Sequence, residues 1–159
     1  MKSIFTIACC LLTLISCGQT KSEQSTETTK FEVSKTEQEW KAQLSEVEYE
    51  VLRKAGTEPA FSGKYVDWKK DGVFTCKGCD NPLFSSETKF KSGTGWPSYY
   101  DVLNESAVVE KTDKKYGWNR TEVICQRCGS HLGHVFKDGP EPTGLRYCIN
   151  SVSLDFEEK

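Results

Sequence analysis

The sequence predicts a mostly antiparallel β domain preceded by short N-terminal helices. Three observations support this: apolar residues at helical spacing between residues 40 and 51, short β-like segments after residue 56, and turn residues between those segments. The chain has 159 residues and a net charge of −2, and this length suits one domain. We expect no nucleic-acid partner, because sequence-independent binding of nucleic acid requires clustered positive charge.

The N-terminal part of the domain has helical periodicity. Its apolar residues recur at spacings of four, three and four: Trp40, Leu44, Val47 and Val51. This stripe is expected to face the core. Ser45 and Glu48 form a capping box and Gly56 supplies a stop, so we expect two short helices that meet near Ser45.

The remainder of the domain is β-like. Short segments rich in β-branched and aromatic residues are separated by Gly, Pro, Asn and Asp, and they predict strands at residues 73–75, 88–91, 107–111, 117–125 and 145–150. A mainly antiparallel sheet structure follows.

Residues 1–17 are expected to be an export signal. The apolar run from Ile4 to Ile15 would reach about 18 Å as a helix, too short for the ~30 Å hydrocarbon core of a membrane. Residues 14–17, LISC, resemble the bacterial lipoprotein cleavage box, which implies that Cys17 is acylated and anchors the protein. We therefore expect an extracytoplasmic protein of the bacterial cell envelope, on the periplasmic face or the cell surface, that contacts the membrane only through its lipid. Cleavage by the ordinary signal peptidase is the alternative.

Residues 18–36 are expected to form a flexible linker, since eight of the 19 are Ser or Thr and the only large apolar residues are Phe31 and Val33. The folded domain is expected over residues 37–159. It carries 17 basic and 20 acidic residues, a net charge of 17 − 20 = −3.

Four cysteines form two pairs, each with a two-residue gap: Cys76 with Cys79, and Cys125 with Cys128. Two such knuckles supply the four tetrahedral thiolates that zinc prefers, and Gly78 and Gly129 lie where the knuckle turns need them. A site filled by four cysteines has no open coordination position, so we expect one structural zinc ion per chain. Because an exported protein can oxidise its thiols, disulfide bonds are the alternative.

Cys148 stands apart from these pairs. In the segment 145–150, alternation directs Leu145, Tyr147 and Ile149 to one face of a strand, and Arg146, Cys148 and Asn150 to the other. A neighbouring guanidinium stabilises a thiolate and lowers the thiol pKa. His131 and His134, the two histidines of the chain, are candidates for proton transfer. From these residues alone, an inert buried cysteine and surface histidines fit equally well.

Four sequence elements carry a resemblance to a known family: GTEPAFSGKY at 56–65, SGTGWPS at 92–98, CGSHLGHVF at 128–136 and GPEPTGLRYCINS at 139–151. Together with both knuckles, they resemble the B-type methionine-R-sulfoxide reductases over residues 37–156. The resemblance implies two antiparallel β-sheets with peripheral helices. It also implies thiol-dependent reduction of methionine R-sulfoxide in peptides and proteins.

The resemblance assigns roles to individual residues. Cys148 would attack the sulfoxide sulfur and become a sulfenic acid, while His131 and His134 position or protonate the oxygen. Trp96 would form an apolar wall for the substrate methyl group, although an aromatic beside a proline turn is more often core packing. Arg146 and Asn150 would organise the thiolate, and Asp138 is expected to join the histidine and arginine network. Lys137 departs from the family, where relatives often carry an acid.

Thr94 is a further departure, because many relatives have a cysteine there that resolves the sulfenic acid. Here Cys9 and Cys10 would be removed, Cys17 acylated and four cysteines bound to zinc. We therefore expect a one-cysteine enzyme whose sulfenic acid is reduced by an external thiol or a thioredoxin-like protein. Separately, we expect a monomer.

Two other classes compete with this interpretation. A zinc-ribbon-like binding module without activity would have no need of Cys148 beside Arg146 or of two histidines. A Cys/His hydrolase is disfavoured because its local signatures are absent.

Overall fold

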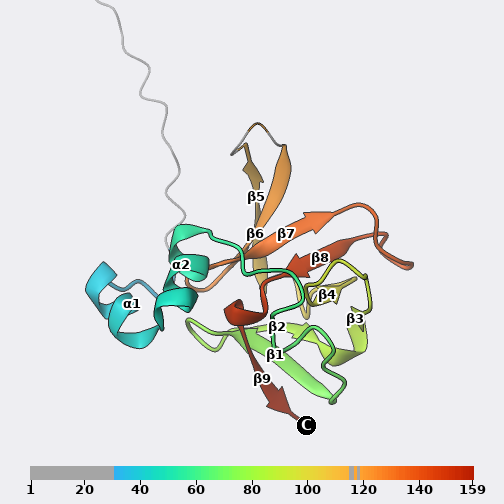
Figure 1. Cartoon of the computed structure of the whole chain (residues 1–159), viewed down its shortest axis with the longest axis horizontal. Coiled ribbons are helices and arrows are strands. Elements are labelled where there is room, and N and C mark those ends of the chain that lie inside the picture. Colours follow the sequence, from blue (N-terminus) through green and yellow to red (C-terminus); the bar gives the residue numbers. More distant parts are fainter. Residues whose placement is uncertain (1–30, 115–116, 118) are drawn as a thin grey trace, which may run out of the picture.

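The computed structural model describes residues 31–114, 117 and 119–159. These residues form two α-helices followed by two antiparallel β-sheets, which confirms the expected fold class (Figure 1). The expected signal peptide, Cys17 and linker residues 18–30 lie outside the described residues. Among the described helices, none is long and apolar enough to cross a membrane.

The two helices are α1 (Glu37–Gln43) and α2 (Glu46–Lys54), and each begins with a capping box. In the second, the Ser45 hydroxyl accepts a hydrogen bond from the Glu48 backbone N–H, and the Glu48 carboxylate accepts one from the Ser45 N–H. The expected break near Ser45 is confirmed. The left-handed residue that ends α2 is Ala55 (φ 54°), and Gly56 follows it with its N–H donating to the Glu50 carbonyl at 3.0 Å.

The expected apolar stripe is wrong at one position. Trp40, Leu44 and Val51 are buried, but Val47 is 57% exposed. Since α1 and α2 are separate helices, one helical period does not continue through both, and the buried residues of α2 are Tyr49, Val51 and Leu52.

A three-stranded sheet has the order β2-β1-β9 and consists of β1 (Gly72–Cys76), β2 (Pro82–Ser85) and β9 (Leu154–Glu158). A six-stranded sheet has the order β3-β4-β8-β7-β6-β5. Its strands are β3 (Lys89–Phe90), β4 (Ser98–Tyr99), β5 (Val108–Asp113), β6 (Arg120–Cys125), β7 (His131–Phe136) and β8 (Arg146–Ile149). Two 3₁₀ turns, η1 (Ser86–Thr88) and η3 (Ser151–Ser153), complete the described elements.

The strand predictions were incomplete. β1, β5, β6 and β8 lie within or overlap the expected segments, whereas β2, β4, β7 and β9 were not expected. The segment 88–91 contains the end of η1 and only the two residues of β3. β7 has two histidines and a glycine, so its sequence lacks the β-branched alternation that marks an isolated strand.

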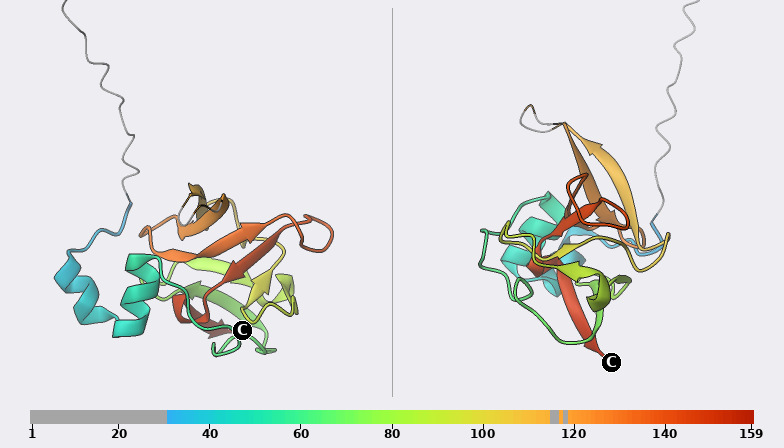
Figure 2. Two further views of the ribbon diagram at one scale, coloured as in Figure 1. Left: turned by 45° about the horizontal axis from the view of Figure 1, so that its top comes forward. Right: turned by 90° about the vertical axis from the view of Figure 1, so that its right-hand side faces the viewer.

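The core lies between the two sheets, and the helices cover one end of it (Figures 1 and 2). Aromatic side chains connect the layers: Phe84 of β2 stacks on Tyr99 of β4 with ring centroids 4.3 Å apart, and Phe74 of β1 meets Tyr99 edge-on at 5.2 Å. The six-stranded sheet is thereby fixed against the three-stranded one.

The last residues of the expected linker contact the domain. The Val33 N–H donates to the Arg127 carbonyl at 2.9 Å, Glu32 forms an ion pair with Arg127 at 3.2 Å, and the Phe31 ring lies against Gly129. The stretch is polar in sequence, but its two large apolar residues, Phe31 and Val33, pack against the folded domain.

Candidate active site and metal centre

The four paired cysteines meet at one point. Their ligand atoms all lie within 4.8 Å of one another, with Cys76 Sγ to Cys128 Sγ at 3.7 Å and Cys79 Sγ to Cys125 Sγ at 3.6 Å. Four sulfur atoms at about 2.3 Å from a tetrahedral ion would be about 3.8 Å apart. The donor set therefore fits a metal ion.

The two pairs come from different sheets. Cys76 ends β1 of the three-stranded sheet, and Cys125 ends β6 of the six-stranded sheet. All four thiols are free, and the short sulfur–sulfur distances run between the pairs and are far longer than the roughly 2.05 Å of a disulfide bond. The geometry favours metal binding over the disulfide alternative.

Of the two glycines expected at the knuckle turns, Gly129 has the left-handed backbone that such a turn needs, and Gly78 does not. Gly129 (φ 70°) has a left-handed backbone and its N–H donates to the Cys125 carbonyl at 2.9 Å. The equivalent residue of the other knuckle is Asp80 (φ 59°), whose N–H donates to the Cys76 carbonyl at 2.8 Å. Gly78 instead allows a close approach, since a Cβ there would lie 3.0 Å from the Ser130 hydroxyl.

Cys148 lies near the middle of the six-stranded sheet, on β8. The register places it opposite Ser98 of β4 on one side and His134 of β7 on the other. Cys148 and His134 line a cavity of about 120 Å³ together with Trp96 and Asn150. The expected grouping of a thiol, an imidazole and an aromatic wall is therefore present.

The Cys148 thiol differs from the expectation in its acidity. Burial raises its pKa, while a hydrogen bond from Thr94 and the charge of Arg146 lower it only in part, so the net direction is upward. The sequence shows the cation next to the thiol, which lowers the thiol pKa. It does not show the burial of Cys148, which raises the pKa because a buried site disfavours the charged thiolate.

A bulge in β7 brings the two histidines together. A spacing of three would place them on opposite faces of a regular strand. Between Val123 and Ile124 of β6, however, β7 advances by two residues, from Gly133 to His131. The two imidazole rings then lie 5.5 Å apart.

Each histidine has a carboxylate partner that sequence reasoning did not identify. Glu122 Oε1 lies 2.7 Å from His131 Nδ1, and Asp113 Oδ2 lies 3.0 Å from His134 Nε2. Arg120 contacts the same Asp113 oxygen at 2.8 Å. Burial lowers the pKa of His134, so its imidazole is neutral at pH 7. His131 Nε2 is buried without a hydrogen-bond partner among the described residues.

Asn150 holds the bulge in place. Its backbone N–H and its side-chain amide both donate to the Leu132 carbonyl, at 2.8 and 3.0 Å. Its side-chain oxygen accepts from the Glu58 N–H at 3.1 Å. The amide expected beside the thiolate thus also lines the cavity and fixes the backbone between the histidines.

Glu58 is a further residue that sequence reasoning missed. Its carbonyl accepts a hydrogen bond from the Trp96 indole at 3.1 Å, and its buried carboxylate accepts from the Ser151 and Val152 N–H groups at 2.6 and 3.0 Å. Glu58 therefore connects the aromatic wall to the turn that follows Cys148. A lone acid in a loop carries no local signal of such a role.

Arg146 is 9% exposed, and Asp138 binds its guanidinium through two hydrogen bonds of 2.9 Å. The guanidinium also lies over the Phe136 ring, 4.4 Å from its centroid. Asp138 does not line the cavity around Cys148, and the acid that reaches His134 is Asp113. The expected contact of Asp138 with Arg146 is therefore present, but Asp138 does not contact the histidines.

Thr94 occupies the place of the absent thiol. Its hydroxyl lies 3.7 Å from Cys148 Sγ and 2.9 Å from the Ser92 hydroxyl. Position 94 is therefore within contact distance of the Cys148 thiol, but it offers an oxygen and not a sulfur.

Replacing Glu58 tests its connecting role. Glu58→Ala leaves two backbone N–H groups without their acceptor, which should lower the free energy of unfolding by about 2–4 kcal/mol. Urea denaturation checks this, with Glu87→Ala at an exposed site as the control. Equal stability of the two variants would contradict the role.

Comparisons with known proteins are consistent with this site. A family model described as SelR domain matches residues 44–158. The chain is 58% identical over 125 residues to "Peptide methionine sulfoxide reductase MsrB" of Thiobacillus denitrificans, covering 79% of this chain and 95% of the relative. It is 60% identical to the protein of that name from Methanosarcina barkeri (79% and 88% covered) and 54% identical over 135 residues to that from Methylibium petroleiphilum (85% and 98%). The chain belongs to the SelR domain family, together with these MsrB proteins.

Proposed function

We propose that this protein reduces methionine R-sulfoxide in peptides and proteins to methionine, with Cys148 as the nucleophile. The observation that carries the proposal is the placement of Cys148 opposite His134, beside Trp96, in one small cavity. Relatives that are 58% and 60% identical to it over 125 residues are named as peptide methionine sulfoxide reductases.

The reaction transfers one oxygen. The Cys148 thiolate attacks the sulfoxide sulfur, and the oxygen takes up a proton as the sulfur becomes tetracoordinate. Cys148 then carries the oxygen as a sulfenic acid and methionine leaves, so the thiol is oxidised by two electrons and the sulfoxide is reduced by two. An external thiol displaces the hydroxyl as water, and a second thiol releases Cys148 as the free thiol.

The surrounding residues support these steps. Because His134 is neutral and lies next to Cys148, it can take the thiol proton and return one to the sulfoxide oxygen. His131 lines the adjoining hollow together with His134, with ring centroids 5.5 Å apart, and it can position His134 for this proton transfer. Trp96 bounds the cavity on the apolar side, where the methyl group would lie. Arg146, held by Asp138, supplies positive charge beside the thiolate.

Zinc is the ion that best suits the four cysteines. A tetrahedral set of four thiolates is the preferred structural site of this ion, and the sulfur positions already match it. When bound, the ion supplies binding energy that stabilises the fold and takes no part in the redox step. Its ligands would be Cys76, Cys79, Cys125 and Cys128.

Export and lipid anchoring are a separate part of the proposal. The apolar run of residues 4–15 followed by LISC supports acylation of Cys17 and an extracytoplasmic location in a bacterial cell envelope. The reductant would then be a thioredoxin-like protein or small thiol outside the cytoplasm, and the protein acts as a monomer.

Activity should depend on one sulfur atom. Cys148→Ser removes the nucleophile, so reduction of dabsyl-methionine R-sulfoxide with dithiothreitol should fall to background while urea denaturation remains unchanged. Turnover equal to wild type would disprove the mechanism. The S epimer serves as the control substrate and should not react with either protein.

Regeneration should not involve a second cysteine of this chain. After one turnover without reductant, mass spectrometry should detect a trapped sulfenic acid at Cys148 and no internal disulfide. Thr94→Cys places a sulfur where the hydroxyl now lies 3.7 Å from Cys148 Sγ, so this variant should form an internal disulfide between positions 94 and 148. An internal disulfide to Cys148 in the wild type would overturn the one-cysteine route.

The metal site is tested separately from the chemistry. Cys76→Ser should reduce bound zinc, measured by mass spectrometry of the native protein, and lower the unfolding midpoint. Cys148→Ser is the matched control and should retain zinc. Full zinc content and stability in Cys76→Ser would exclude this ligand set.

A further inference from the structure

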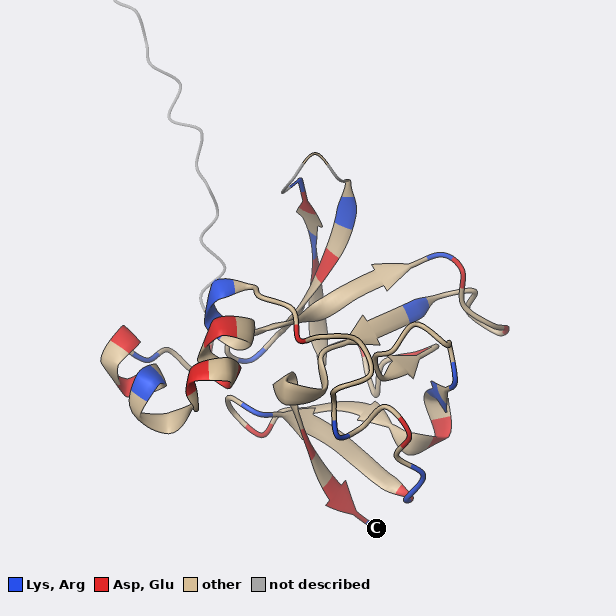
Figure 3. Cartoon of the chain, in the orientation of Figure 1, with Lys and Arg blue, Asp and Glu red and all other residues tan. Residues whose placement is uncertain are grey.

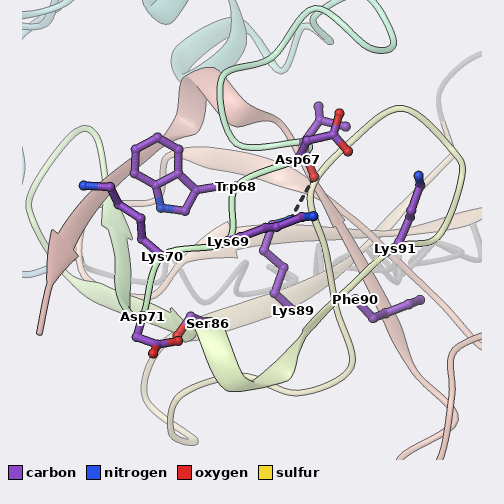
Figure 4. Close-up of a pocket in the computed structure, with 10 residues that line it drawn as sticks. Asp67, Trp68, Lys69, Lys70, Asp71, Ser86, Lys89, Phe90 and Lys91 are labelled. Atoms are coloured by element: carbon purple, nitrogen blue, oxygen red, sulfur yellow. Dashed lines mark hydrogen bonds between the residues drawn. The ribbon is translucent and has the colours of Figure 1, made fainter.

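The cavity around Cys148 continues into two further hollows. Trp96 lines both this cavity and a second hollow, of about 210 Å³, which also contains Phe61 and Phe90. The second hollow shares Phe90 and Lys91 with a third, of about 260 Å³ (Figure 4). We call the second and third hollows together the flanking groove. It leads away from Cys148 on the Trp96 side.

Phe61 is the most unusual residue of the flanking groove. Its side chain is 71% exposed, the largest value among the exposed large hydrophobic residues of the described chain. Its backbone is left-handed (φ 64°), a conformation that is unfavourable for a bulky residue. The Phe61 N–H donates to the Gly95 carbonyl at 2.8 Å, which holds the ring next to Trp96. The chain thus maintains a strained, exposed aromatic beside the active site, although the ring gains little burial within the described fold.

The far part of the flanking groove is rich in lysine. Four lysines line it against two acids, Asp67 and Asp71. The Lys89 ammonium donates a hydrogen bond to the Val66 carbonyl at 2.8 Å. Figure 4 shows Phe90 and Lys91 on the side away from Trp68 and Lys70. Lys70 is paired with Glu158 at 2.7 Å, whereas Lys69 and Lys91 form no ion pair within the described residues. Figure 3 shows basic segments on the loop after β3 and on the loop leading into β1.

We propose that the flanking groove binds the substrate polypeptide on one side of the methionine sulfoxide, with an apolar side chain against Phe61 and Phe90 and an acidic side chain near Lys91. This inference rests on the proposed function and names its substrate class. An extended segment fits because the hollows follow one another from the Cys148 cavity through shared lining residues. Charge complementarity selects an acidic residue over a basic one. A small substrate such as N-acetyl-methionine sulfoxide would reach only the cavity around Cys148.

The test uses eight-residue peptides with a central methionine R-sulfoxide and a leucine beside it. Each peptide carries two Asp or two Lys residues, placed either on the N-terminal or on the C-terminal side of the sulfoxide. When the charged residues lie on the side that enters the flanking groove, wild-type kcat/KM should be about fivefold higher for the Asp peptide than for the Lys peptide at low salt. The difference should shrink at high salt. Lys91→Glu should reverse this preference. Lys111→Glu, an exposed site on β5 with the same charge change, should preserve it.

Phe61→Asn tests the apolar contact, since asparagine tolerates the left-handed backbone and the variant should fold. It should raise KM for the leucine-containing peptides severalfold and leave kcat/KM for N-acetyl-methionine sulfoxide unchanged. Equal kcat/KM for Asp and Lys peptides on both flanks, or peptide kinetics unaffected by Phe61→Asn, would overturn the groove while the enzyme remained active. Absence of turnover with every sulfoxide would instead overturn the proposed function.

Discussion

The convergence of four cysteines is the constraint on which the rest of the structure depends. Cys76 closes a strand of the small sheet and Cys125 closes a strand of the large one, and the two sheets meet where these strands end. The second knuckle leads directly through Ser130 into His131 and β7. Arg53 of α2 donates to the Cys128 carbonyl and to the Ser130 hydroxyl, both at 3.2 Å, so the helical layer is held at the same place. A metal ion bound here would secure the start of β7, which carries both histidines.

From that fixed point, the site is assembled by polar contacts between segments that are far apart in sequence. The bulge in β7 turns both histidines to one side, and Asn150 secures the bulge by binding Leu132. Glu58 joins Trp96 to the turn after Cys148, and its carboxylate is buried in doing so. Because these contacts come from buried or half-buried groups, they restrict the site more than exposed ion pairs would.

The environment of Cys148 has opposing effects on the pKa of its thiol. Burial raises the pKa of the thiol, whereas the Thr94 hydroxyl and Arg146 favour the thiolate. A thiol in such a place is kept from bulk oxidants and ionises when a base such as neutral His134 is close. The cavity around Cys148 shares Trp96 with the second hollow of the flanking groove, so the half-buried thiol lies beside an open surface.

The sequence by itself determined the local features of this protein. Capping boxes, paired cysteines and the family motifs depend on residues that are neighbours in the chain. The β class and both helices follow from such local patterns, and the family motifs single out Cys148. Only the tertiary structure decided that Val47 is exposed, that Asp80 and not Gly78 is left-handed, and that burial outweighs Arg146 in setting the pKa of Cys148. It also supplied the partners Glu58, Asp113 and Glu122. Register, bulges and burial arise from contacts between distant segments, and no local pattern of residues encodes them.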